Sequence, residues 1–199
     1  MKQTNHLTLK LFLITLLFTF ISCEDKVDFS VLPGETQSGN NTFGCRVDGK
    51  IFIGNIYTTW QQAPLFVEYH REIDLLLISA DGKFEDGKMG NMSMEIYHPK
   101  VDIPLNMDNG SFKCSYWTNH ETKSQEYFAS YYDFTAESEL IITKFDTVNK
   151  IVSGKFSMKG SLLPYSKPSI GCFESDTIQI TEGKFDLKIN TIYNDLIEK

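Results

Sequence analysis

The sequence lacks the short motifs that identify many enzyme classes. Its 199 residues contain no C-x-x-C, G-x-S-x-G, H-E-x-x-H, G-x-x-x-x-G-K-[ST] or G-x-G-x-x-G segment. These are signatures of zinc sites, serine hydrolases, metalloproteases and nucleotide-binding loops. Basic residues are scattered singly and the net charge is −7. Because binding to phosphates needs a clustered basic surface, nucleic acid is not expected as a partner. We also predict no metal and no cofactor.

Long apolar runs are missing beyond the N-terminus. The segment 11–21 is apolar apart from Thr15 and Thr19, but it is too short for a spanning helix, which needs about 20 apolar residues. A basic-leaning start followed by an apolar stretch of this length is typical of a secretory signal peptide. We therefore predict that residues 1–22 form a signal peptide and that the mature chain is exported.

The apolar segment ends in F-I-S-C, residues 20–23, which resembles a bacterial lipobox. The resemblance implies cleavage before Cys23 and a lipid on this cysteine. Such a lipid would anchor the protein, since each buried CH₂ contributes about 0.8 kcal/mol. The alternative is a plain signal peptide, with Cys23 cut away or left as an ordinary thiol. If Cys23 is lipidated, Cys45, Cys114 and Cys172 remain, and the sequence does not choose among their three pairings into one disulfide.

The rest of the chain divides into a linker and a strand-rich region. Residues 23–41 are interpreted as the lipidated cysteine and a flexible tether, because the stretch is rich in Pro, Gly, Ser, Thr and Asn and has no regular apolar spacing. Beyond it, Asp48-Gly49 fits a two-residue hairpin turn. The apolar segments 141–145 and 151–158 flank a second, polar turn.

Short strands at this spacing predict a single all-β domain over residues 42–199. We expect an antiparallel β-sandwich or a partly closed barrel built from hairpins. No internal repeat is predicted. Two Gly-Lys-Phe segments begin at Gly154 and Gly183, and we interpret them as ordinary hairpin sequence.

Three segments together resemble a family of uncharacterised envelope lipoproteins from Bacteroidota. They are N-T-F-G-C-R-V-D-G-K-I-F from residue 41, L-I-I-T-K-F-D-T-V-N-K-I-V-S-G-K-F-S-M from residue 140, and D-T-I-Q-I-T-E-G-K-F-D-L-K from residue 176. Members of that family share a lipobox, a short tether, a Gly-Cys-x-x-(Asn/Asp)-Gly-Lys opening hairpin and a Thr-(Asp/Glu)-Gly-(Arg/Lys)-Phe-Asp closing segment. The resemblance implies an all-β outer-membrane lipoprotein at the periplasmic face or the cell surface, and it implies no activity.

The same resemblance gives a meaning to the acidic residues after the cysteine. Glu24 and Asp25 look like the signal that sends lipoproteins of this phylum to the outer face of the outer membrane. The alternative is that both residues belong to a solvated tether.

Aromatic residues are dense in the middle of the chain. Trp60, Tyr116, Trp117, Tyr131 and Tyr132 could contact a glycan or a peptide, since Tyr and Trp give amphipathic contact area. The alternative is that they fill the core, because aromatic residues favour strands. Adjacent residues such as Tyr116 and Trp117 point to opposite faces of a strand, so one of the two is expected to face outward.

Two threonines follow aspartates in a pattern that resembles the Bacteroidota acceptor for protein O-glycosylation. They are Thr147 in Asp-Thr-Val and Thr177 in Asp-Thr-Ile. Such tripeptides also occur by chance.

These observations favour a lipid-anchored envelope protein that is non-enzymatic and binds a glycan or an envelope protein or serves a structural role. One alternative is a small glycan-acting hydrolase with two carboxylates, drawn from Glu68, Glu72 and Glu95. Another is a β-barrel that carries a ligand inside.

Overall fold

The computed structural model describes residues 28–54, 64–107, 110–121, 127–135, 137–162 and 177–194. These residues form strands and no helix, which confirms the all-β prediction. None of the described segments is therefore a helix that could cross a membrane. The strands are β1 (Thr42–Val47), β2 (Lys50–Gly54), β3 (Leu65–His70), β4 (Leu75–Phe84), β5 (Met89–Tyr97), β6 (Pro104–Asn106), β7 (Phe112–Glu121), β8 (Tyr127–Phe134), β9 (Glu139–Asp146), β10 (Ile151–Leu162), β11 (Thr177–Lys188) and β12 (Thr191–Tyr193).

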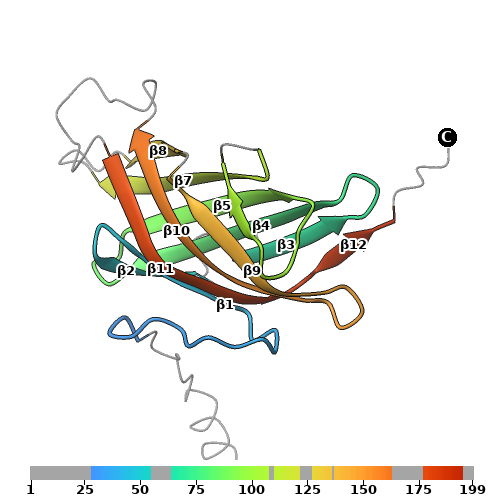
Figure 1. Ribbon diagram of the computed structural model, residues 1–199. Coiled ribbons are helices and arrows are strands. Elements are labelled where there is room, and N and C mark those ends of the chain that lie inside the picture. The colour runs from blue at the N-terminus through green and yellow to red at the C-terminus, as the bar shows by residue number, and fades with distance from the viewer. Residues whose placement is uncertain are drawn as a thin grey trace, which may run out of the picture.

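The strands curl into a partly closed barrel (Figure 1). Antiparallel pairing runs from β1 through β2, β4, β5, β7, β8, β10 and β11 and returns to β1. This circuit is completed at one end only, because β4 and β10 change partners along their lengths. Gly82–Phe84 of β4 pairs with β2, whereas Leu75–Ala80 pairs with β3. Likewise β10 pairs with β8 near its end and with β9 near its start.

One pairing departs from the antiparallel prediction. Two residues after the end of β11, the chain forms β12, which runs parallel to β3. This arrangement is held by hydrogen bonds from the Asn190 amide to the Val67 carbonyl and from the Val67 amide to the Asn190 side chain. The hairpin pattern did not reveal this connection, because it joins residues that are far apart in the sequence.

The core lies inside the barrel and follows the alternation of the strands. In β4 every second residue is buried from Leu76 to Phe84, as expected when one face of a strand meets the core. The largest fully buried side chains include Tyr116, Phe43, Phe52, Phe112, Met92 and Met94. The same alternation in β5 buries Met92, Met94 and Ile96.

The two Gly-Lys-Phe segments lie side by side in β10 and β11. The antiparallel register pairs Gly154 with Phe185, Lys155 with Lys184, and Phe156 with Gly183. Each phenylalanine therefore lies opposite the other segment's glycine, and the rings of Phe156 and Phe185 stack at 6.3 Å between centroids. We call this arrangement the GKF pair. Pairing of the two segments with each other was not predicted from the sequence.

Candidate functional site

Residues 28–41, here called the strap, run alongside β1 on the outside of the barrel (Figure 1). Their side chains and backbone also contact β9, β10 and β11. The Gln37 side chain donates a hydrogen bond to the Thr143 carbonyl, and the Lys144 ammonium donates one to the Gln37 carbonyl. At the end of the strap, the Lys188 amide donates to the Asn41 side chain. The flexible tether predicted for residues 23–41 is therefore corrected over 28–41, and residues 23–27 lie outside the described residues.

The strap is held by the carboxylate of Asp186 in β11, a side chain that is only 1% exposed. Its two oxygens accept hydrogen bonds from three successive strap amides and two hydroxyls. The donors are the amides of Ser38 at 3.1 Å, Gly39 at 2.8 Å and Asn40 at 3.1 Å, with the hydroxyls of Thr36 and Ser153. Successive amides that converge on one anion form a backbone nest, so the carboxylate fixes the local shape of the strap.

Hydrogen bonding decides the ionisation of Asp186. Burial by itself raises the pKa of this carboxyl, because it disfavours the charged form. The hydrogen bonds from Thr36, Ser153, Gly39 and Asn40 outweigh burial and lower the pKa to about 2. Asp186 is consequently a charged group at neutral pH, although it is covered by the strap.

This lowered pKa predicts a dependence of stability on pH. An unfolded Asp titrates near 3.9, so the charged Asp186 stabilises the fold fully above about pH 5, and this contribution is lost as the pH falls through 2. The difference corresponds to about 2.5 kcal/mol of unfolding free energy. Urea unfolding of the wild type and of Asp186→Asn, compared between about pH 5 and pH 2, should give the steeper loss in the wild type. Equal slopes would contradict the assignment.

A second contact joins the strap to the GKF pair. Lys155 and Lys184 lie directly opposite each other on β10 and β11, where two like charges repel. Glu35 of the strap lies between them, with its carboxylate oxygens 2.8 Å from the Lys155 nitrogen and 3.7 Å from the Lys184 nitrogen. The hydrogen bond from Lys155 contributes most to lowering the pKa of Glu35. The carboxylate of Glu35 thus reduces the repulsion between the two lysines.

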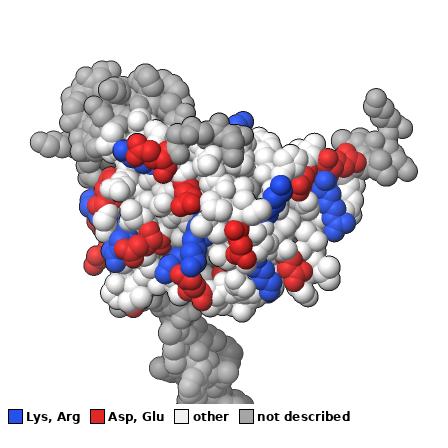
Figure 2. All heavy atoms as spheres, in the orientation of Figure 1, with Lys and Arg blue, Asp and Glu red and all other residues white. Residues whose placement is uncertain are grey.

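Charges elsewhere on this side of the molecule are mixed in sign. Figure 2 shows Lys and Arg side chains interspersed with Asp and Glu, without a large patch of either sign. This distribution agrees with the scattered basic residues of the sequence.

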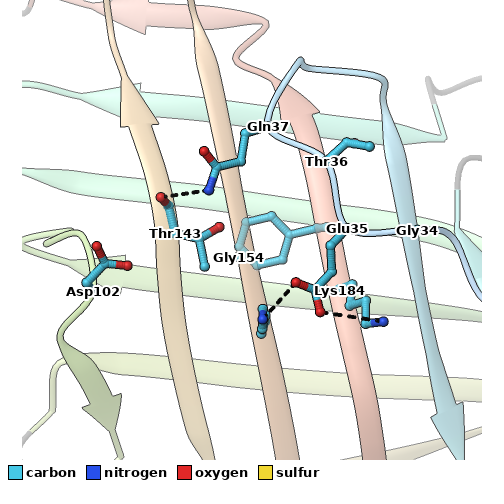
Figure 3. A pocket seen from close by; sticks show the side chains of 10 residues that line it. Gly34, Glu35, Thr36, Gln37, Asp102, Thr143, Gly154 and Lys184 are labelled. Carbon is cyan, nitrogen blue, oxygen red and sulfur yellow. Dashed lines mark hydrogen bonds and ion pairs between the residues drawn. The ribbon is translucent and has the colours of Figure 1, made fainter.

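A hollow of about 390 Å³ lies between the strap and the sheet (Figure 3). Its polar lining includes Glu35, Gln37, Asp102, Thr143 and the GKF-pair lysines, and the remaining lining residues are Gly34, Thr36, Gly154 and Phe185. A volume of this size suits a small ligand, and the lining offers hydrogen-bond donors, acceptors and both charges. Among the described residues, no group of three or more His, Cys, Asp or Glu is arranged to hold a metal ion.

Of the aromatic residues predicted to contact a ligand, one is in the core and the side chains of the others are not described. Tyr116 is 1% exposed and its ring lies 6.3 Å from that of Phe52, so the ligand-contact prediction is corrected to a core role. Trp117 and Tyr131 are paired across β7 and β8. Their side chains, that of Tyr132 and the whole of Trp60 lie outside the described residues.

Two of the four cysteines, Cys45 and Cys114, lie among the described residues. Cys45 is a free buried thiol, and burial raises its pKa strongly. Cys114 is also buried and is not joined to Cys45. Cys172, Cys23 and the acidic residues Glu24 and Asp25 lie outside the described residues.

Both predicted glycosylation threonines lie at ends of strands. Thr147 is half-buried in the turn between β9 and β10, and Thr177 is an exposed residue at the start of β11. Asp146 has a structural role, because its carboxylate accepts hydrogen bonds from the amides of Val148 and Asn149. Modification of the two threonines stays a prediction.

The three carboxylates considered for hydrolysis line neither the hollow under the strap nor a second hollow beside the β1–β2 turn. Glu68 is buried and accepts a hydrogen bond of 2.8 Å from the Tyr193 hydroxyl. Glu72 lies in an exposed turn, and Glu95 accepts a hydrogen bond from the Tyr97 hydroxyl. In the sheet β4 separates the strands of Glu68 and Glu95.

Sequence reasoning missed Asp186 and Glu35, which connect the strap to the sheet. The two Gly-Lys-Phe segments could have indicated part of this site. If they pair in antiparallel register, their two lysines lie opposite each other and need a nearby negative charge. Comparison of the chain with family models, curated protein sequences and solved structures finds no match.

Proposed function

We propose that the protein is a lipid-anchored envelope protein whose β domain is a non-enzymatic binding or structural module at the outer membrane or cell surface. The observation that carries this proposal is the position of the lipobox-like segment relative to the strap. Cys23 precedes Asp28, the first described residue of the strap, by five positions. A lipid on Cys23 would therefore be connected to the folded domain by a very short stretch of chain.

The hollow under the strap is the proposed binding position. It combines hydroxyl, amide, carboxylate and ammonium groups, which suit a small polar ligand such as a sugar unit of an envelope glycan. Binding there would involve the strap, and it would therefore occur close to the proposed anchor.

Lipid attachment is tested with radiolabelled palmitate. Cells that express the full chain should incorporate label into the wild type, and Cys23→Ala should lose all of it because the acceptor thiol is gone. Cys45→Ser is the matched control, since Cys45 is buried within the barrel. Label that persists in Cys23→Ala, or that is missing from the wild type, would contradict the proposal.

Ligand binding is tested separately with the full chain and a panel of envelope glycans. Binding that is reduced at least tenfold by Thr143→Val and Gln37→Ala would support the hollow as the binding position. Binding that is unchanged in both variants would place the ligand elsewhere, and no binding at all would leave the structural role.

A further inference from the structure

The start of the strap determines which part of the domain lies nearest to the proposed lipid. Phe29 lines a second hollow, of about 410 Å³, together with Gly49 and Lys50 at the β1–β2 turn. Glu85 and Asp86, from the turn between β4 and β5, also line this hollow. The start of the strap therefore lies beside these two turns.

The length of chain between the lipid and this position is small. Consecutive Cα atoms are 3.8 Å apart, so the five positions from Cys23 to Asp28 span at most ~19 Å. The tether suggested by the composition of residues 23–41 would reach several times further. The length of free chain is shorter than the composition suggests, because contacts of Asp186 and Glu35 bind the later part of the strap to β10 and β11.

The strap also presents apolar surface near its start. Val31 is 65% exposed, and the half-buried Phe29 lies two residues before it. The lining of the neighbouring hollow carries both signs of charge, since it includes Arg46, Lys50, Glu85 and Asp86. A surface of this kind fits zwitterionic lipid headgroups, in which phosphate and ammonium groups lie above an apolar layer.

We infer that the domain rests on the membrane in one orientation, with the β1–β2 and β4–β5 turns and the start of the strap against the lipid headgroups. This inference rests on the proposed lipidation of Cys23. The strap then acts as a spacer whose length is fixed by the fold. The β3–β4 turn lies at the opposite end of the barrel in Figure 1, and it faces away from the membrane.

The orientation is tested by fluorescence quenching from nitroxide-labelled lipid. Full-length protein bearing its lipid is reconstituted into vesicles of phosphatidylcholine and phosphatidylethanolamine, with one fluorophore attached at Val31→Cys or Ile73→Cys. Ile73 is a matched control, because it is 60% exposed but belongs to the β3–β4 turn. A Cys172→Ser background is used, and Cys45 and Cys114 are buried. Quenching at position 31 should exceed that at position 73 at least threefold.

A linker variant separates orientation from attachment. Twenty Gly and Ser residues inserted between Asp25 and Lys26 should remove the difference between positions 31 and 73, while palmitate labelling continues. Equal quenching at the two positions in the original chain, with palmitate attached, would overturn the orientation and leave the proposed function intact. Absence of palmitate from the wild type would overturn both.

Discussion

Replacing Asp186 with alanine should lower the free energy of unfolding by about 3–5 kcal/mol. The change removes a buried charge that accepts hydrogen bonds from five donors. Each donor left without a partner away from water costs about 1–3 kcal/mol, and water that enters as the strap loosens offsets part of the sum. Urea unfolding at neutral pH measures the effect. Hydrogen exchange should also become faster at the amides of Ser38, Gly39 and Asn40, because their acceptor is lost.

Two variants control this experiment. Asp186→Asn keeps one carbonyl acceptor and should lie between the wild type and alanine. Asp146→Ala removes a carboxylate that also accepts backbone hydrogen bonds, but it does so in an exposed turn, so its effect should be much smaller. A loss below about 1 kcal/mol for Asp186→Ala would show that the strap is not held by this carboxylate.

Replacing Gly183 with alanine should lower the free energy of unfolding by about 2–3 kcal/mol, as for other overpacked cores. A β-carbon at this position would lie 2.4 Å from atoms of the Phe156 ring. The ring is 4% exposed and also packs against Phe43, at 5.4 Å between centroids, so it has no room to move. The effect is measured by chemical denaturation.

Gly34→Ala is the matched control, because a β-carbon there meets nothing within 4 Å. Its free energy of unfolding should stay within about 0.5 kcal/mol of the wild type. In the double variant Gly183→Ala/Phe156→Leu, the combined loss should be smaller than the sum of the single losses, since the ring that clashes is gone. Additive losses would mean that the glycine is required for another reason.

The sequence determined the class of fold because the relevant signals are local. Alternating burial along β5 follows from the apolar residues Met92, Met94 and Ile96 at every second position, and the turn at Asp48-Gly49 follows from residues that tolerate a positive φ. The structure confirms both. Local patterns do not fix how a curled sheet closes, so a sandwich and a partly closed barrel could not be told apart.

The candidate site could not be predicted in the same way. Composition suggested a free tether over residues 28–41, because polar and glycine-rich chain has little apolar surface to bury. What binds the strap is instead a set of polar contacts with Asp186 and with the lysines of the GKF pair, which lie about 120 to 150 positions away in the sequence. Such contacts leave no periodic signal in either segment.

The sequence by itself determined the strand pattern, the scattered charge and the position of Cys23 beside an apolar segment. The tertiary structure decided the remaining features. It pairs two Gly-Lys-Phe segments so that each ring covers the other glycine, and it buries a carboxylate that captures the strap. The physical reason is that side chains in different strands become neighbours only when the sheet closes. Asp186 therefore fixes residues 36–40 against the sheet, and the composition of this segment does not reveal the contact.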